Sequence, residues 1–180
     1  MGILESFGSL PTHPLLVHFP IVLVPVTLIL AVLAVFWRRY QRGLAIALLC
    51  TGVIGGGAGY LAGESGEKLQ RRLPNGQDAA IMHHASYGDT AKTLCALLVI
   101  MSIVYAVWVW RDRLGMGPGN AVGRVLSGTW VAVVLGVAVI GLSAAATTWV
   151  VLAGHSGAEA VWQKTWTTLP PAPAGGGEEG

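Results

Sequence analysis

Four long apolar segments divide this 180-residue chain and limit the folds open to it. They run from about residue 14 to 37, 44 to 63, 89 to 110 and 126 to 154. Each is close to the roughly 20 residues that an α-helix needs to cross the hydrocarbon core of a bilayer. A surface helix of a soluble domain would instead carry a charged or polar face. The segments therefore predict an all-α integral membrane protein, a four-helix bundle with antiparallel up-down topology.

The composition agrees with a membrane setting. Hydrophobic residues make up 53% of the chain and charged residues only 11%, whereas about a quarter of the residues in soluble domains are charged. The net charge of +2 gives no basic surface for nucleic acid. One transmembrane domain over residues 14–160 fits this length, after an N-terminal extracytoplasmic segment of residues 1–13 and before a flexible Pro/Gly-rich tail of residues 161–180.

The positions of the arginines predict the orientation. Six of them lie in the first and third connections: Arg38, Arg39, Arg42, Arg111, Arg113 and Arg124. The second connection also holds basic residues, but these alternate with acids. By the positive-inside rule, the first and third connections are expected in the cytoplasm and both termini outside.

All five histidines fall at the end of the predicted bundle that holds the termini: His13, His18, His83, His84 and His155. Ionisable residues inside membranes are rare and usually functional. Imidazoles that are spread along a sequence but gathered in space are what a metal or haem site requires. The other half of the bundle holds no histidine, which argues against a chain of two haems across the bilayer.

The sequence also predicts which of these side chains face inward. We expect His18 about one turn inside the membrane and more buried than His13, which would lie at the interface. Neighbouring helical positions point about 100° apart, so only one of His83 and His84 can face the interior, and His84 continues the apolar phase. Glu64 could accept the second N–H of an imidazole, or it could be an exposed acid of the loop.

Glycines are frequent in the second segment: Gly52, Gly55, Gly56, Gly59 and Gly63. Small residues at such spacing let helix backbones approach closely in lipid. They could equally leave room for a flat macrocycle. The helix-packing interpretation is the simpler of the two.

Several short motifs together resemble a known family. They are His13-Pro-Leu-Leu-Val-His18-Phe-Pro, Gly63-Glu64, His84, and Gly154-His155-Ser-Gly157. On these the chain resembles a bacterial membrane family, domain of unknown function 2231, over about residues 10 to 160. The resemblance implies a four-helix membrane protein without an established activity; together with the positive-inside rule it predicts a multi-pass protein of the bacterial inner (cytoplasmic) membrane with both termini extracytoplasmic. Members that are joined to Rieske iron–sulfur or cytochrome c domains imply an electron-transfer setting. Members often carry a further His-Gly after the last glycines, where this chain has Ala160-Val-Trp-Gln-Lys164.

The first functional hypothesis is a b-type haem protein that passes electrons near the outer face. Low-spin haem takes two axial imidazoles, for which we expect His18 and His84, with His155 competing for either place. Glu64 or His13 would hydrogen-bond the second imidazole nitrogen or a haem propionate. A separate Rieske or cytochrome c protein, or a quinone, would exchange the electrons, and the chain could belong to a hetero-oligomeric complex.

Two other hypotheses remain. Three or four imidazoles with Glu64 could bind zinc or copper. Alternatively, the chain could be a structural subunit of a larger respiratory or photosynthetic membrane complex. A hydrolytic enzyme has little support, because the sequence contains no GxSxG, HExxH or P-loop motif. A non-catalytic electron-transfer or accessory subunit is therefore the expectation.

Overall fold

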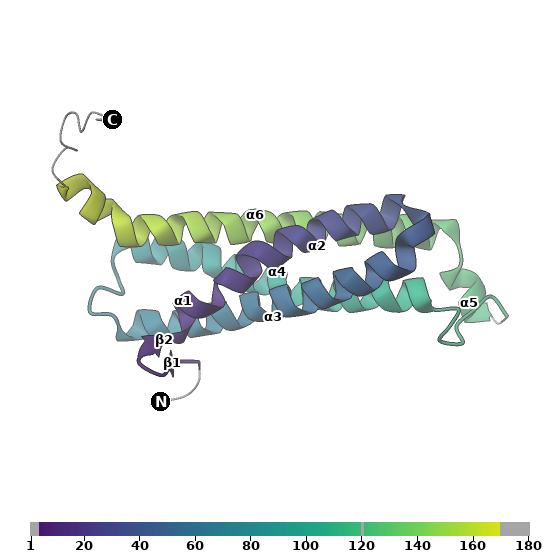
Figure 1. Cartoon of the computed structure of the whole chain (residues 1–180), viewed down its shortest axis with the longest axis horizontal. Coiled ribbons are helices and arrows are strands. Elements are labelled where there is room, and N and C mark those ends of the chain that lie inside the picture. Colours follow the sequence, from purple (N-terminus) through teal and green to yellow (C-terminus); the bar gives the residue numbers. More distant parts are fainter. Residues whose placement is uncertain (1–3, 120, 170–180) are drawn as a thin grey trace, which may run out of the picture.

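The computed structural model describes residues 4–119 and 121–169 (Figure 1). Its body consists of four long helices: α2 (His18–Phe36), α3 (Gln41–Arg72), α4 (Ala79–Trp110) and α6 (Thr129–Thr168). The shorter elements are strands β1 (Ser6–Phe7) and β2 (Leu10–Pro11), helices α1 (Thr12–Leu16) and α5 (Ala121–Leu126), and the 3-10 helix η1 (Arg38–Tyr40). The two strands pair in an antiparallel ribbon before α1.

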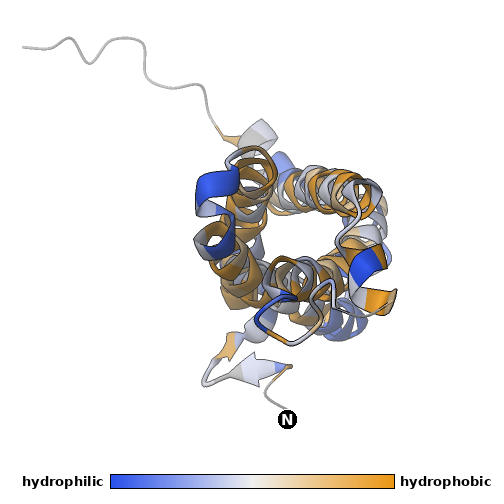
Figure 2. Ribbon diagram, turned by 90° about the vertical axis from the view of Figure 1, so that its right-hand side faces the viewer, coloured by the Kyte–Doolittle hydropathy of each residue, from blue (hydrophilic) through white to orange (hydrophobic). Residues whose placement is uncertain are grey.

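Four stretches are helical, long and apolar enough to cross a membrane, which confirms the predicted four-helix transmembrane protein. They are Thr12–Phe36, Arg38–Arg72, Ala79–Trp110 and Thr129–Gln163. Large apolar side chains cover their outer surface; Phe19, Ile29 and Val137 are all more than half exposed. Seen along the bundle, hydrophobic residues colour the outward faces of the helices (Figure 2). Such an apolar surface is stable in lipid. The helices can also lie in lipid because their backbone groups hydrogen-bond to one another.

Three helices continue beyond the apolar segments that predicted them. Helix α3 runs on to Arg72, α4 begins already at Ala79, and α6 ends only at Thr168. Hydropathy marks the part of a helix that contacts lipid, whereas the backbone hydrogen bonds carry on into more polar sequence. Helix α6 therefore occupies the first part of the predicted tail; residues 170–180 of that tail lie outside the described residues.

The first apolar segment forms two helices instead of one. Helix α1 ends at Leu16 and α2 begins at His18, with Val17 between them. Pro20 has no backbone N–H and cannot donate a hydrogen bond to the carbonyl of Leu16. The helical ladder therefore lacks one bond here, although Val17 keeps helical dihedrals and donates to the carbonyl of His13 at 3.2 Å.

Each long helix packs against two others. Helices α3 and α6 each contact both α2 and α4, so that α2 and α4 lie across one diagonal of the bundle and α3 and α6 across the other. At Gly52 an added Cβ would lie 2.1 Å from the Oγ of Ser102, and at Gly56 it would lie 2.8 Å from the carbonyl oxygen of Cys95. Neighbouring helices thus fill the space above the glycines of α3, which supports the helix-packing interpretation over room for a macrocycle.

The two halves of the chain repeat one pattern of buried positions. In α2 these are Pro20, Val24, Thr27, Ala31 and Ala34, and the buried positions of α4 include Ala91, Cys95, Leu98, Ser102 and Tyr105. Each residue of the first set precedes its counterpart by 71 residues. Buried positions of α3 and α6 correspond at an offset of 91 residues: Leu48 with Val139, Gly52 with Ser143, and Gly55 with Ala146. The segments α1–α3 and α4–α6 are therefore internal repeats. Equivalent helices lie at opposite corners of the bundle, as a two-fold repeat about the bundle axis requires.

Candidate functional site

Two histidines meet at one end of the bundle from opposite sides of its diagonal. His13 belongs to α1, and His84 lies in the second turn of α4. Their ring centroids are 6.1 Å apart, with an angle of 68° between the ring planes. Both side chains are partly buried. The offset of 71 residues also separates these two, so they are equivalent positions of the two halves.

Each imidazole is anchored through the same ring nitrogen. The Nδ1 of His13 lies 2.8 Å from the carbonyl oxygen of Ala62, and the Nδ1 of His84 lies 3.0 Å from that of Ala153 and 3.3 Å from the Oγ of Ser156. A carbonyl oxygen can only accept a hydrogen bond, so this pairing assigns the proton to Nδ1 on both rings. The Nε2 atoms then keep their lone pairs, which is the tautomer of a metal-ligating histidine whose other nitrogen is held by the protein.

The two acceptor carbonyls belong to one motif that occurs twice. Residues 62–66 read Ala-Gly-Glu-Ser-Gly, and residues 153–157 read Ala-Gly-His-Ser-Gly. In each copy the serine is buried and donates its hydroxyl to the carbonyl of the motif's alanine, at 2.9 Å for Ser65 and 3.1 Å for Ser156. The serine of each motif therefore positions the alanine carbonyl, and this carbonyl orients the imidazole.

The last glycine of each motif makes room for the ring above it. An added Cβ at Gly66 would lie 3.0 Å from the Cε1 of His13, and one at Gly157 would lie 3.0 Å from the Cε1 of His84. A side chain at either position would push the imidazole away from its carbonyl. This role of the glycines was not predicted, although the repeated Ala-Gly-x-Ser-Gly pattern was a signal for it.

The other histidines lie outside this pair. His18 is exposed, so the prediction that it is more buried than His13 is wrong. Five residues along a helix turn a side chain by about 140°, so the two side chains point in different directions. The side chain of His155 is 75% exposed, with its Nε2 3.3 Å from Glu159, and His83 is exposed as well. The structure thus brings His13, instead of His18 or His155, beside His84.

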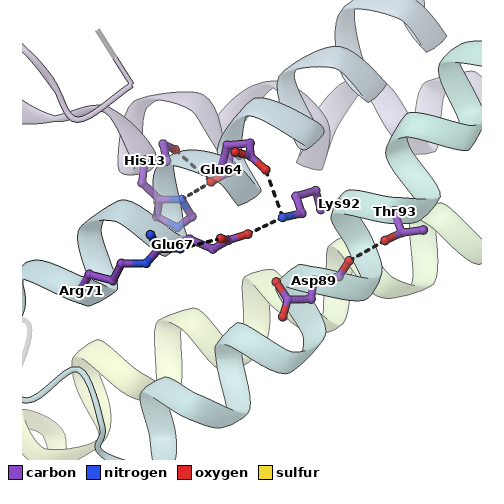
Figure 3. A network of polar contacts seen from close by, with 9 residues as sticks. His13, Glu64, Glu67, Arg71, Asp89, Lys92 and Thr93 are labelled. Atoms are coloured by element: carbon purple, nitrogen blue, oxygen red, sulfur yellow. Dashed lines mark hydrogen bonds and ion pairs between the residues drawn. The ribbon is translucent and has the colours of Figure 1, made fainter. Parts of the chain in front are cut away.

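Glu64 has a different partner from the one that we expected. Its Oε1 lies 3.1 Å from the Nζ of Lys92, which also contacts Glu67 (Figure 3). Glu67 forms a second ion pair with Arg71, at 3.2 Å. The predicted hydrogen bond from an imidazole to Glu64 is therefore replaced by an ion pair between α3 and α4. The side chain of Lys92 is only 20% exposed. Its ion pair was not predicted, although a lone cation within an apolar segment was a signal for it.

Larger ligand sets do not form in the part of the chain that the structure describes. Within residues 4–119 and 121–169, no three histidine, cysteine, aspartate or glutamate side chains are grouped so as to hold a metal ion. The predicted zinc or copper set of three or four imidazoles with Glu64 is not assembled there. What the structure assembles is a pair of equivalent imidazoles.

Comparison with known proteins identifies a family that covers most of the chain. The model of a family described as "predicted membrane protein" (DUF2231) matches residues 9–170, which includes both histidines of the pair and both copies of the motif. No curated protein and no solved structure matches the chain.

Proposed function

The chain belongs to the family of predicted membrane proteins DUF2231, and in that membrane setting we propose that it binds one b-type haem between His13 and His84 and passes electrons. The proposal differs from the sequence-based hypothesis in one ligand, because His13 replaces His18. It keeps the reaction class, the cofactor and the single site near one end of the bundle.

One observation carries the proposal: two imidazoles with anchored Nδ1 atoms lie edge-on to each other, with their centroids 6.1 Å apart. Nitrogen ligands about 2.0–2.1 Å from one ion, on opposite sides of it, place their ring centroids roughly 6 Å apart. The separation of the two rings is therefore the one that a bis-imidazole iron requires. Neutral imidazoles from opposing helices are also the axial ligands that a low-spin haem uses.

When bound, a haem would supply reversible one-electron exchange. The chain's own residues would set its position and surroundings. The Ala62 and Ala153 carbonyls orient the two rings and make them more basic as ligands. Directly below the pair, the apolar cluster around Ala91, Cys95 and Val150 keeps water from the centre of the bundle. A quinone, or a separate Rieske or cytochrome c protein, would be the electron partner.

The test is the haem content of purified protein from cells supplied with haem, measured for five single variants. His13→Ala and His84→Ala should each abolish the reduced α-band of the wild type. His18→Ala, His83→Ala and His155→Ala are matched controls from the same end of the bundle and should retain it. Loss in His18→Ala with retention in His13→Ala would restore the sequence-based pair. A wild type with stoichiometric zinc or copper and no porphyrin would refute the haem assignment.

A further inference from the structure

The opposite end of the bundle contains a pocket of about 900 Å³. Its wall is formed by the end of α2, η1, the start of α3 and the end of α4 with the two residues that follow. The lining residues include Leu33, Trp37, Arg38, Arg39, Arg42 and Arg111. This pocket lies far along the helices from the histidine pair, so it is a separate site.

The pocket is strongly basic. Four arginines line it against a single carboxylate, that of Asp112. The Nε of Arg111 lies 3.8 Å from Asp112. Among the described residues, no ion pair joins a carboxylate to Arg38, Arg39 or Arg42. Within the part of the chain that the structure describes, the positive charge of the lining is therefore mostly uncompensated.

Arg111 is held with a hydrogen-bond donor still unused. Its Nη1 donates to the backbone carbonyl of Trp108 at 2.9 Å, and its guanidinium carbon lies 4.9 Å from the centroid of the Trp108 ring. Its Nε is buried and has no hydrogen-bond partner. A buried donor without a partner is costly, and the planar guanidinium fork matches the oxygens of a phosphate. The arrangement calls for an oxyanion.

The remaining lining is apolar and aromatic. Leu33, Leu44 and Val109 contribute aliphatic surface, and Trp37 and Trp108 contribute aromatic rings. These residues stand at the ends of helices that are apolar enough to cross a membrane, where aromatic side chains mark the interface with the headgroups. A ligand that fits carries a phosphate at one end and hydrocarbon at the other.

From this pocket we propose that the chain binds the phosphate of an anionic phospholipid headgroup, with Arg38, Arg42 and Arg111 as its partners. The shared chemistry is a phosphate, which a free ion could also supply, but the apolar part of the lining favours the lipid. Basic clusters at the cytoplasmic surface attract anionic lipids by about 1 kcal/mol for each arginine. By the positive-inside rule this end is the one expected to face the cytoplasm.

The test is native mass spectrometry of the full chain in mild detergent, with phosphatidylglycerol or phosphatidylcholine added. The wild type should retain one phosphatidylglycerol in preference to phosphatidylcholine. The double variant Arg38→Gln/Arg42→Gln should weaken that retention about tenfold or more. These two side chains are exposed, so the fold should survive, and the helical circular-dichroism signal checks this.

Two exposed arginines outside the pocket give a matched control. The double variant Arg113→Gln/Arg124→Gln removes the same charge from the same end of the bundle and should leave the retention unchanged. Equal losses in the two double variants would overturn the proposal, because a diffuse basic surface would then explain the binding. Equal retention of the two lipids by the wild type would overturn it too. Binding of inorganic phosphate as tightly as of the lipid would overturn the assignment to a headgroup.

Discussion

Gly56 and Gly57 are neighbours in α3, and the same substitution should have opposite effects at the two positions. A Cβ added at Gly56 would lie 2.8 Å from the carbonyl oxygen of Cys95 and 2.9 Å from the Cγ2 of Val99. The closest atom belongs to the backbone of α4, which cannot rotate away. At Gly57 nothing lies within 4 Å of the added Cβ.

The expected size follows from two opposing terms. Overpacking of a tight contact costs about 1–3 kcal/mol, whereas replacing glycine by alanine inside a helix gains about 0.5–1 kcal/mol. Gly56→Ala should therefore destabilise the bundle by about 1–2 kcal/mol. Gly57→Ala has only the favourable term and should stabilise it by about 0.5–1 kcal/mol. The gain from replacing glycine is common to both variants, so they should differ by the overpacking term alone, about 1–3 kcal/mol.

The assay is reversible unfolding in mixed micelles, with sodium dodecyl sulfate as the denaturant and helical circular dichroism as the signal. The midpoint should move to lower denaturant for Gly56→Ala and to higher denaturant for Gly57→Ala. Free energies of unfolding within about 0.5 kcal/mol of each other would refute the close approach of α3 and α4 at this level.

Two further substitutions address the site end of the bundle. Lys92→Met removes the cation between two glutamates and should lower the free energy of unfolding by about 1 kcal/mol, given the partial exposure of the ion pairs. Adding Glu67→Gln to this variant should recover part of the loss. A double variant with a still lower free energy of unfolding would contradict the ion-pair account. Gly157→Ala places a methyl group 3.0 Å from the Cε1 of His84 and should weaken haem binding, as judged by titration of the apoprotein, whereas Gly141→Ala, with nothing within 4 Å of its added Cβ, should bind haem like the wild type.

The four membrane-spanning helices could be predicted because length and lack of charge suffice to identify them. Their ends could not, since polar helical turns such as residues 64–72 carry no hydropathy signal. Pro20 predicts a weak point in the first helix, because it removes the hydrogen bond to the carbonyl of Leu16. Prolines are tolerated in many transmembrane helices, so the sequence alone does not decide whether one bends the helix or divides it.

The sequence predicts that the histidines gather at one end of the bundle. It does not predict which two of them meet. The choice of His18 rested on depth in the membrane, but which imidazoles meet is decided by rotation about the helix. The internal repeat would have given the answer. His13 and His84 are equivalent positions, because the offset of 71 residues relates α1 and α2 to α4, and each meets a copy of the Ala-Gly-x-Ser-Gly motif. Such a long-range pattern is visible in one sequence only when the two halves are aligned with each other.

The most direct test of the paired-imidazole account is the reduced absorbance spectrum of His13→Gly, recorded with and without free imidazole. Removing the side chain opens a space that a small imidazole can enter, so rescue separates a ligand from a residue that merely supports the fold. The account predicts that the b-type α-band is lost in the variant and returns when imidazole is added, with no return in a matched sample that receives pyrrole, which has no lone pair for the iron. A variant whose spectrum equals that of the wild type without any addition would contradict the account.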